Sequence, residues 1–178
     1  MSEQVIILTA AALERALKRM AHEIAERNES ARVLALVGIQ RGGVFIAQRL
    51  GLLLKEVLGQ DVSSGSLDVS MHRDDIGTQA TPDVHPTIIP FDVTGRTVVL
   101  VDDVLFSGRT TRAALDALND FGRPQRVQLA VLIDRGHREL PIKADFVGKN
   151  VPTSLRERVN VQLKETGGQD IVTLEKHE

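Results

Sequence analysis

The chain contains no cysteine, no tryptophan and no tyrosine among its 178 residues. The lack of cysteine excludes a disulfide framework, a thiolate zinc site and a cysteine nucleophile. The five phenylalanines leave few aromatic platforms on which single-stranded nucleic acid could stack. The five histidines show no spacing typical of metal ligands, which argues against a structural metal site.

Long apolar runs are also absent. No stretch approaches the roughly 18 apolar residues of a membrane span, and residues 1–8 lack the basic and apolar segments of a signal peptide. We therefore expect a cytoplasmic protein that does not cross a membrane. The net charge of −2 excludes a surface that is basic throughout, so binding to nucleic acid would need a local basic patch.

The chain contains enough apolar residues for a folded core, since 42% of its residues are hydrophobic and 26% are charged. The length suits one domain over residues 1–178. Helical spacing and capping signals predict helices over residues 9–28, 44–58 and 110–121. Strands are expected at residues 33–37, 61–70, 97–101, 127–133, 146–147, 159–163 and 171–174. The alternating order predicts an α/β fold with a central parallel sheet flanked by helices.

Residues 71–90 differ in composition from the rest of the chain. Charged residues and prolines alternate there without a sustained apolar period. We expect a long, mobile surface loop, and loops of that length within a compact domain are usually functional or disordered. Arg73 is its best-placed cation.

The most informative stretch lies between the apolar strand 97–101 and the helix that follows it. The strand is followed by Asp102 and Asp103, and then by a turn that contains Ser107 and Gly108. In an open parallel sheet, ligands bind at the carboxyl ends of the strands. Backbone N–H groups and hydroxyls at the start of a helix predict a phosphate site there. The two carboxylates would then lie beside the sugar that carries the phosphate.

The same residues also allow a purely structural interpretation. Acidic residues and a Ser-Gly turn are common at the start of helices, and a lone Asp-Asp pair would more often be structural than functional. The whole run over residues 98–110 is more specific and favours a functional site. Carboxylates there can accept hydrogen bonds from vicinal hydroxyls and stabilise a sugar carbon that becomes positive as its leaving group departs.

Residues 98–110 resemble the binding signature for 5-phosphoribosyl diphosphate (PRPP) of type I phosphoribosyltransferases. Residues 134–154 are similar to one subfamily, the bifunctional pyrimidine-operon regulators with uracil phosphoribosyltransferase activity (the PyrR family). The resemblance covers nearly the whole chain, and the C-terminal end is its least informative part. It implies the type I phosphoribosyltransferase fold, with a mobile active-site loop and a small hood.

The resemblance implies that PRPP and uracil react to give UMP and diphosphate, with Mg²⁺ as cofactor. The catalytic residues it implies are Asp102 and Asp103, which contact the ribose hydroxyls directly or through water and Mg²⁺, and Arg73, which closes over PRPP. It assigns PRPP and its phosphates to Arg41, Gly42, Val104, Leu105, Phe106, Ser107, Gly108, Arg109, Thr110 and Thr111. It assigns uracil to Arg135, Phe146 and Val147. In the diphosphate turn, Arg41-Gly42 stands where many members have Thr-Arg, which moves the cation one position earlier.

The resemblance also implies regulation of the pyrimidine operon by transcription attenuation. UMP or UTP would promote binding to a stem-loop in the messenger RNA leader, and a homodimer or larger homo-oligomer is implied. The implied RNA-binding residues are Arg19, His22, Arg27, His137, Arg138 and Lys143. Basic side chains outnumber acidic ones over residues 123–143, which provides a local patch. Mixed charge on a helix is equally typical of a solvated surface, and His137 and Arg138 could instead serve the active-site entrance.

Two alternatives remain open. The chain could be a salvage phosphoribosyltransferase for a purine or for orotate, without RNA binding, although residues 134–154 argue against this. It could also be a regulator whose enzyme site has decayed. The intact Asp102, Asp103 and Arg109 argue against that second alternative.

Overall fold

The structure, a computed structural model, describes residues 3–28, 33–73 and 84–176. Its centre is a five-stranded sheet with the order β3-β2-β4-β5-β6, in which every neighbouring pair is parallel. The strands are β2 (Leu34–Ile39), β3 (Ser63–Leu67), β4 (Thr97–Leu105), β5 (Arg126–Asp134) and β6 (Phe146–Asn150). The predicted α/β fold with a central parallel sheet is confirmed.

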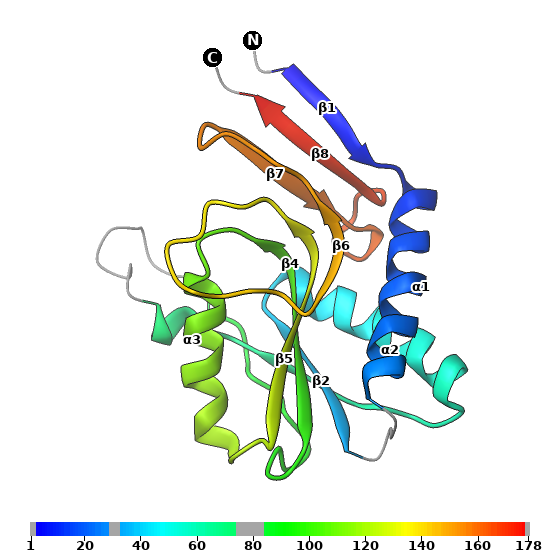
Figure 1. Cartoon of the computed structure of the whole chain (residues 1–178), viewed down its shortest axis with the longest axis vertical. Helices are drawn as coiled ribbons and strands as arrows, with labels where there is room; N and C mark the ends of the chain where they lie inside the picture. The colour runs from blue at the N-terminus through cyan, green and yellow to red at the C-terminus, as the bar shows by residue number, and fades with distance from the viewer. Residues whose placement is uncertain (1–2, 29–32, 74–83, 177–178) are drawn as a thin grey trace.

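Three α-helices cover the sheet, α1 (Ala10–Arg27) and α2 (Gly42–Leu58) on one face and α3 (Arg109–Leu118) on the other (Figure 1). Thr9 caps α1 by accepting a hydrogen bond from the Ala12 N–H at 3.3 Å. In the described parts of the chain, no helix combines the length and apolar character that a bilayer crossing needs. Short 3₁₀ turns occur at Ser70–His72, Asn119–Phe121 and Lys164–Thr166.

The central strand β4 shows why the sheet needs helices on both faces. Val99 and Val101 belong to the apolar cluster formed with α1 and α2, whereas Val98 and Leu100 belong to the cluster formed with α3. Successive side chains of a strand point to opposite faces, so a continuous apolar run buries one set on each side.

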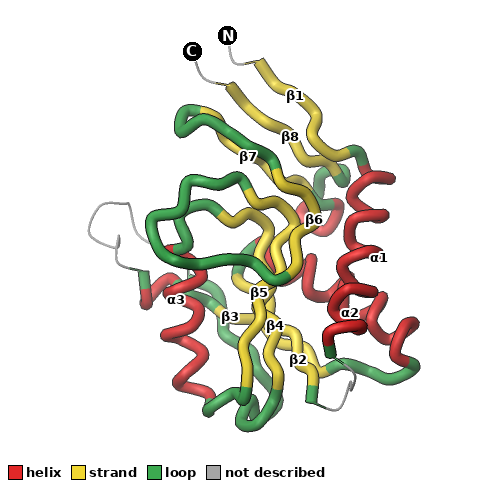
Figure 2. The backbone as a smooth tube through the Cα atoms, viewed as in Figure 1, coloured by secondary structure: helices red, strands yellow, loops and turns green. Residues whose placement is uncertain are grey.

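A second sheet lies at one end of the molecule, where both chain termini are found (Figure 2). It contains β1 (Glu3–Leu8), β8 (Ile171–Lys176) and β7 (Glu157–Gln162), which pair antiparallel in that order. Leu8, Val159 and Val172 from these strands join the apolar cluster under α1 and α2. We call this small sheet the hood.

The structure corrects the expected bounds in several places. β4 continues through Asp102 to Leu105, where a loop was expected, because Asp102, Val104 and Leu105 keep pairing with β5. The strand in residues 61–70 is confined to Ser63–Leu67. The strand Glu3–Leu8 was not expected at all. Residues 74–83 of the predicted active-site loop lie outside the described residues.

Candidate active site

The end of β4 and the start of α3 form a tight junction. The turn Phe106-Ser107-Gly108 connects them, and Gly108 has a φ of 90°, a left-handed conformation that glycine adopts far more readily than other residues. A Cβ atom at Gly108 would also lie 3.0 Å from Cγ1 of Ile142. Only glycine suits this position without strain.

The first turn of α3 is arranged to receive an anion. Its N-cap residue, Gly108, makes no side-chain cap hydrogen bond, and the turn contains no acidic residue that would repel an anion. The Arg109 N–H donates a hydrogen bond of 3.3 Å to Oγ of Ser107. The buried Oγ1 of Thr111 finds no hydrogen-bond partner among the described residues. A phosphate group at the start of the helix would supply an acceptor for the Thr111 hydroxyl.

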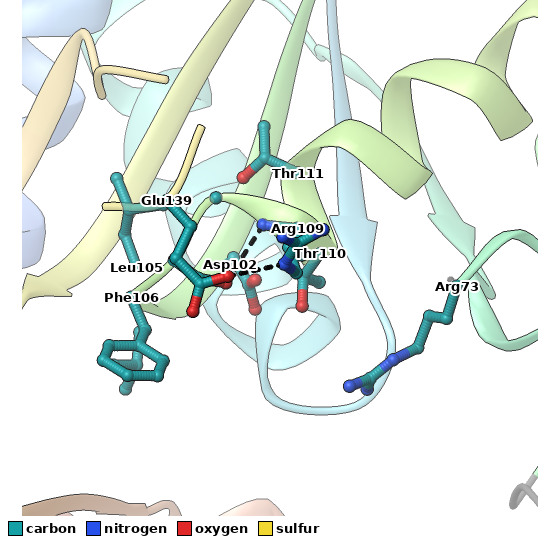
Figure 3. Close-up of a pocket in the computed structure, with 11 residues that line it drawn as sticks. Arg73, Asp102, Leu105, Phe106, Arg109, Thr110, Thr111 and Glu139 are labelled. Carbon is teal, nitrogen blue, oxygen red and sulfur yellow. Dashed lines mark hydrogen bonds and ion pairs between the residues drawn. The ribbon is translucent and has the colours of Figure 1, made fainter. Parts of the chain in front are cut away.

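A cavity of about 300 Å³ opens at this junction (Figure 3). Its wall consists of Arg73, Asp102, Val104, Leu105, Phe106, Ser107, Gly108, Arg109, Thr110, Thr111 and Glu139. The structure therefore brings Arg73 together with a carboxylate and the phosphate turn, as the sequence predicts. Glu139 is the one wall residue that the sequence analysis did not assign to the site. Its position directly after His137 and Arg138 was the only available signal.

The two acidic residues differ in their surroundings. Asp102 is buried, and its Oδ1 accepts a hydrogen bond of 2.9 Å from the Asp103 N–H. Burial raises the pKa of Asp102 well above its usual range, and the negative charge of Asp103 adds to this effect. Asp103 is less buried, and its Oδ1 accepts a 2.7 Å hydrogen bond from the Val104 N–H. Asp102 thus holds its proton to a higher pH than an ordinary aspartate.

The predicted diphosphate turn approaches the same acidic pair from the start of α2. A Cβ atom on Gly42 would lie 2.4 Å from Oδ2 of Asp103, and one on Gly43 would lie 2.2 Å from the Val101 carbonyl oxygen. These glycines let the two segments approach closely. Arg41 is exposed and follows a cis Gln40–Arg41 peptide bond. Neither Arg41 nor Gly42 belongs to the cavity wall described above.

The residues implied for uracil lie in three different environments. The buried Arg135 donates to Oγ1 of Thr153 and to the Ser154 carbonyl, and its guanidinium lies 4.3 Å from the centre of the Phe106 ring. The Phe146 side chain belongs to the apolar core. The Val147 carbonyl accepts hydrogen bonds from Arg19. Arg135 is thus the member of this set that packs against a residue of the cavity wall.

The residues implied for RNA binding fall into two groups. Arg19, His22 and Arg27 lie on the exposed side of α1, where Arg19 pairs with Glu23 at 2.7 Å and Arg27 with Asp145 at 3.4 Å. The guanidinium of Arg27 also lies 5.0 Å from the centre of the Phe146 ring.

The second group lies in the segment between β5 and β6. His137 has a φ of 65° and contacts the Thr153 carbonyl through Nε2. Arg138 donates to the carbonyls of Ile142 and Phe106 at 2.9 and 2.8 Å. Lys143 is exposed. Arg138 therefore has a structural role, because it joins this segment to the phosphate turn.

The acidic pair also fits the way proteins hold Mg²⁺. Among the described residues, no group of three or more His, Cys, Asp or Glu side chains could enclose a metal ion. Mg²⁺ usually retains several waters and is bound by one or two carboxylates together with substrate phosphates. Asp102 and Asp103, beside a phosphate-binding turn, offer that donor set.

Comparison with known proteins agrees with this geometry. Residues 4–163 match the phosphoribosyl transferase domain family. A bifunctional protein PyrR from Roseiflexus sp. is 61% identical over 163 residues, which cover 91% of this chain and 89% of the relative. The chain belongs to the PyrR family of phosphoribosyltransferases. Another PyrR protein, from Chloroflexus aurantiacus, is 57% identical over 175 residues, 98% of this chain and 96% of the relative.

Solved structures confirm the type I phosphoribosyltransferase fold outside the PyrR family. A hypoxanthine phosphoribosyltransferase of Trypanosoma cruzi aligns with a TM-score of 0.71 at 18% identity, covering 97% of each chain. A hypoxanthine-guanine phosphoribosyltransferase of Bacillus anthracis aligns with a TM-score of 0.69 at 18% identity, covering 94% of this chain and 95% of that one. At such identities the likeness establishes the fold alone.

Proposed function

We propose that this PyrR-family chain transfers the phosphoribosyl group of PRPP to uracil, forming UMP and diphosphate, and that it also regulates the pyrimidine operon by binding its messenger RNA leader. The observation that carries the enzymatic half is the cavity at the end of β4, where the start of α3, which has no side-chain cap, and the buried carboxyl of Asp102 line the same wall. A phosphorylated sugar requires an anion site and a carboxyl group beside it, and few other ligands require both.

In this proposal the turn at residues 107–111 holds the 5′-phosphate of the ribose. The N–H groups of the first turn of α3 donate to the phosphate oxygens, and the helix dipole favours the negative charge. Oγ1 of Thr111, which has no partner among the described residues, donates a further hydrogen bond. Arg109 adds a guanidinium at the wall of the cavity.

Asp102 and Asp103 face the ribose hydroxyls. These two carboxylates would hold Mg²⁺ together with the phosphates of PRPP, and the bound ion would supply positive charge to offset the charge that builds up on the departing diphosphate. The carboxylates orient the sugar and stabilise its anomeric carbon as the bond to diphosphate breaks. Uracil N1 attacks that carbon, and its proton is released. No covalent enzyme intermediate is needed, which agrees with the lack of a cysteine nucleophile.

Water must be kept from the reacting carbon, because a ribosyl cation-like centre is readily hydrolysed. Arg73 at the cavity wall and the Arg41-Gly42 turn beside Asp103 supply the groups that enclose the diphosphate. Arg135 positions the base end of the site through Phe106. Phe146 and Val147 remain the other residues assigned to uracil.

For the regulatory half, the exposed side of α1 and the segment between β5 and β6 provide basic side chains for RNA phosphates. Arg19, His22, Arg27, His137, Arg138 and Lys143 remain the proposed contacts. A homodimer or larger assembly would present two copies of this surface. Because the ligand is a messenger RNA, we place the protein in the cytoplasm.

The enzymatic proposal is tested by incubating the protein with PRPP, Mg²⁺ and either uracil, hypoxanthine or orotate. We expect product formation with uracil and at least about 100-fold lower kcat/KM with the other two bases. Replacing both Asp102 and Asp103 by Asn should lower turnover by about two orders of magnitude or more. Asp116→Asn removes an exposed carboxylate of α3 and is the matched control, with turnover unchanged. Turnover of hypoxanthine or orotate without uracil would contradict the proposal.

The regulatory proposal is tested by measuring leader RNA affinity at several salt concentrations, with and without UMP. UMP should tighten binding, and Lys143→Ala should reduce the slope of log affinity against log salt by about 0.7–0.9, one phosphate contact. Lys143 is preferable to Arg138, whose loss would also release the Phe106 carbonyl. Lys55→Ala, an exposed lysine of α2, should leave the slope unchanged. Binding that responds to neither UMP nor Lys143→Ala would contradict this role.

A further inference from the structure

The segment over residues 135–142 is built directly onto the phosphate turn. Its backbone and the Arg138 side chain donate hydrogen bonds to three consecutive carbonyl oxygens, the last one of β4 and the first two of that turn. These bonds are Arg135 N–H to Leu105 at 3.1 Å, Arg138 Nη1 to Phe106 at 2.8 Å, and the N–H groups of Glu139 and Leu140 to Ser107 at 2.9 and 3.1 Å. Any rearrangement of the turn therefore changes the support of this segment, which we call the 135–142 loop.

Glu139 is the member of this loop that reaches into the cavity. Its Oε2 lies 2.7 Å from Nε of Arg109, and both side chains are about half exposed, 54% and 45% (Figure 3). A carboxylate in the wall of a phosphate site repels the phosphate and occupies a guanidinium that the phosphate would use. Because exposed ion pairs contribute little free energy, a phosphate dianion can replace the carboxylate on Arg109.

We propose that Glu139 competes with the phosphate of the ligand for Arg109. When the phosphate displaces Glu139, the contacts of the 135–142 loop change, so that the loop responds to ligand binding in the cavity. This inference rests on the proposed function in one respect, since the ligand that carries the phosphate is PRPP or UMP. It assigns Glu139 the role of an affinity-setting residue rather than a catalytic one.

The loop also has a packed connection to the residues proposed for RNA. The Phe106 ring lies 4.3 Å from the Arg135 guanidinium and makes an edge contact with the His137 ring, with 6.0 Å between the ring centres. Arg138 holds the Phe106 carbonyl. A change in the phosphate turn therefore alters the contacts that His137 and Arg138 make with Phe106. These contacts connect a nucleotide in the cavity to the residues proposed for RNA binding.

The competition is tested by titrating inorganic phosphate and, separately, UMP into the wild-type protein and Glu139→Gln, with calorimetric detection. The substitution keeps the size of the side chain and removes its charge, so both ligands should bind about three- to tenfold more tightly at low salt. The gain should shrink as salt rises, because exposed charges are screened. Glu56→Gln, an exposed residue of α2, makes the same change in net charge and should leave both affinities unchanged.

Equal or weaker binding of phosphate and UMP by Glu139→Gln would overturn the competition. A gain that persists undiminished at high salt would also overturn it, because that result indicates a change in packing rather than in charge. Inorganic phosphate requires no uracil chemistry, so this outcome is independent of whether uracil proves to be the substrate.

The signal to the loop is tested by amide hydrogen exchange of peptides covering residues 135–142, with and without UMP. In the wild-type protein UMP should change their exchange, since the N–H groups of Glu139 and Leu140 are bonded to the phosphate turn. In Glu139→Gln the same change should fall to less than about half, because the carboxylate that is displaced is already gone. A full response in Glu139→Gln, or no response in the wild-type protein, would overturn the proposal.

Discussion

At the scale of single residues, Asp102 links the chemistry of the site to the stability of the protein. Burial and the neighbouring Asp103 raise its pKa above the ordinary 3.8. The folded protein then binds this proton more tightly than the unfolded chain does. The resulting stabilisation is present at acidic pH, below the unfolded value, and is lost as the pH rises through the folded pKa. At neutral pH the buried carboxyl lowers stability.

Asp102→Asn should therefore raise the free energy of unfolding at pH 7–8 by about 1–3 kcal/mol, while it lowers turnover. Asparagine keeps an oxygen that can accept the Asp103 N–H but cannot become charged. Urea unfolding at pH 5, 7 and 8 measures the effect, and the gain should grow with pH. Asp116→Asn is the exposed control and should change stability by less than about 0.5 kcal/mol. A less stable Asp102→Asn protein at pH 8 would contradict the argument.

At the scale of elements, periodicity and capping signals were sufficient for the three helices and the buried strands. Thr9 and Gly59 stand where α1 begins and α2 ends. The extension of β4 through Asp102 was not predictable, because polar residues in sequence look like a loop until the neighbouring strand is known to pair with them. β1 was missed for a related reason, since its partner β8 lies at the other end of the chain.

The candidate site also has one part that the sequence predicts and another that depends on contacts between distant segments. Its phosphate turn is contiguous in sequence, so the resemblance carried by residues 98–110 already implied the stretch from Val104 to Thr111, which lies in the cavity wall. Glu139 and the packing of Arg135 on Phe106 depend on how the segment after β5 folds back over the turn. No local sequence pattern predicts that the segment after β5 folds back over the phosphate turn. The assigned roles of the individual residues remain predictions.

The start of α2 gives a prediction about close approach. Gly42→Ala would place a methyl group 2.4 Å from Oδ2 of Asp103, so the carboxylate must shift. We expect the KM for PRPP to rise about tenfold with a small change in stability. Gly51→Ala, in the same helix, is the control, because its new Cβ meets only Cδ1 of Leu36 at 3.7 Å.

Gly51→Ala should leave the kinetics unchanged and stabilise α2 by up to about 1 kcal/mol. Steady-state kinetics and urea unfolding of both variants distinguish the two positions. An unchanged KM for PRPP in Gly42→Ala would contradict the proposed role of the diphosphate turn.

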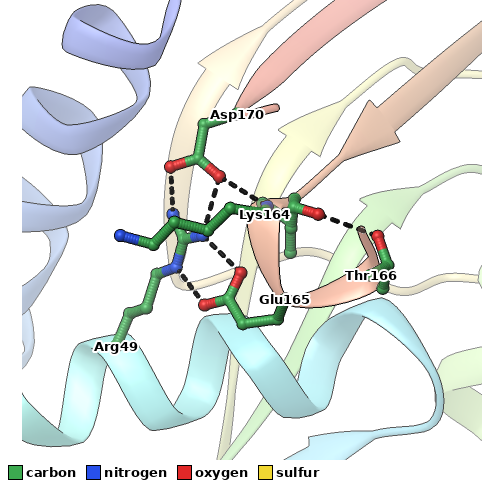
Figure 4. Close-up of polar contacts among 6 residues, drawn as sticks. Arg49, Lys164, Glu165, Thr166 and Asp170 are labelled. Carbon is green, nitrogen blue, oxygen red and sulfur yellow. Dashed lines mark hydrogen bonds and ion pairs between the residues drawn. The ribbon is translucent and has the colours of Figure 1, made fainter. Parts of the chain in front are cut away.

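At the scale of the whole molecule, Arg49 joins helix α2 to the connection between strands β7 and β8 of the hood. From α2 it donates to Glu165 through Nε at 2.7 Å and to Asp170 through Nη1 and Nη2 at 2.9 and 2.8 Å (Figure 4). Asp170 also accepts from the Lys164 N–H at 2.9 Å. The Arg49 side chain is only 17% exposed, so this ion-pair network is better shielded from solvent than most surface pairs.

Arg49→Ala should lower the free energy of unfolding at pH 7 by about 1–3 kcal/mol, because two partly buried carboxylates lose their partner. Hydrogen bonds from Arg49 lower the pKa values of Glu165 and Asp170 below their usual 4.5 and 3.8. Their stabilisation is present above those values and is lost as the pH falls through the folded ones. The difference between wild type and variant should therefore shrink below about pH 4.

Lys55→Ala removes the exposed pair with Asp61 and should cost less than about 0.5 kcal/mol at any pH. Urea unfolding from pH 3 to 7 compares the two variants. A loss in Arg49→Ala no larger than that in Lys55→Ala would show that the hood is held by its apolar contacts alone.

The central claim is that the end of β4 and the start of α3 bind the phosphate group of a phosphorylated pentose. The most direct test is a titration of ¹⁵N-labelled protein with UMP, followed by the amide resonances. The account predicts that the largest shift changes fall on residues 107–111, with the change at Gly108 among them. Saturating UMP that leaves those amides unmoved, or that shifts a different surface, would contradict it.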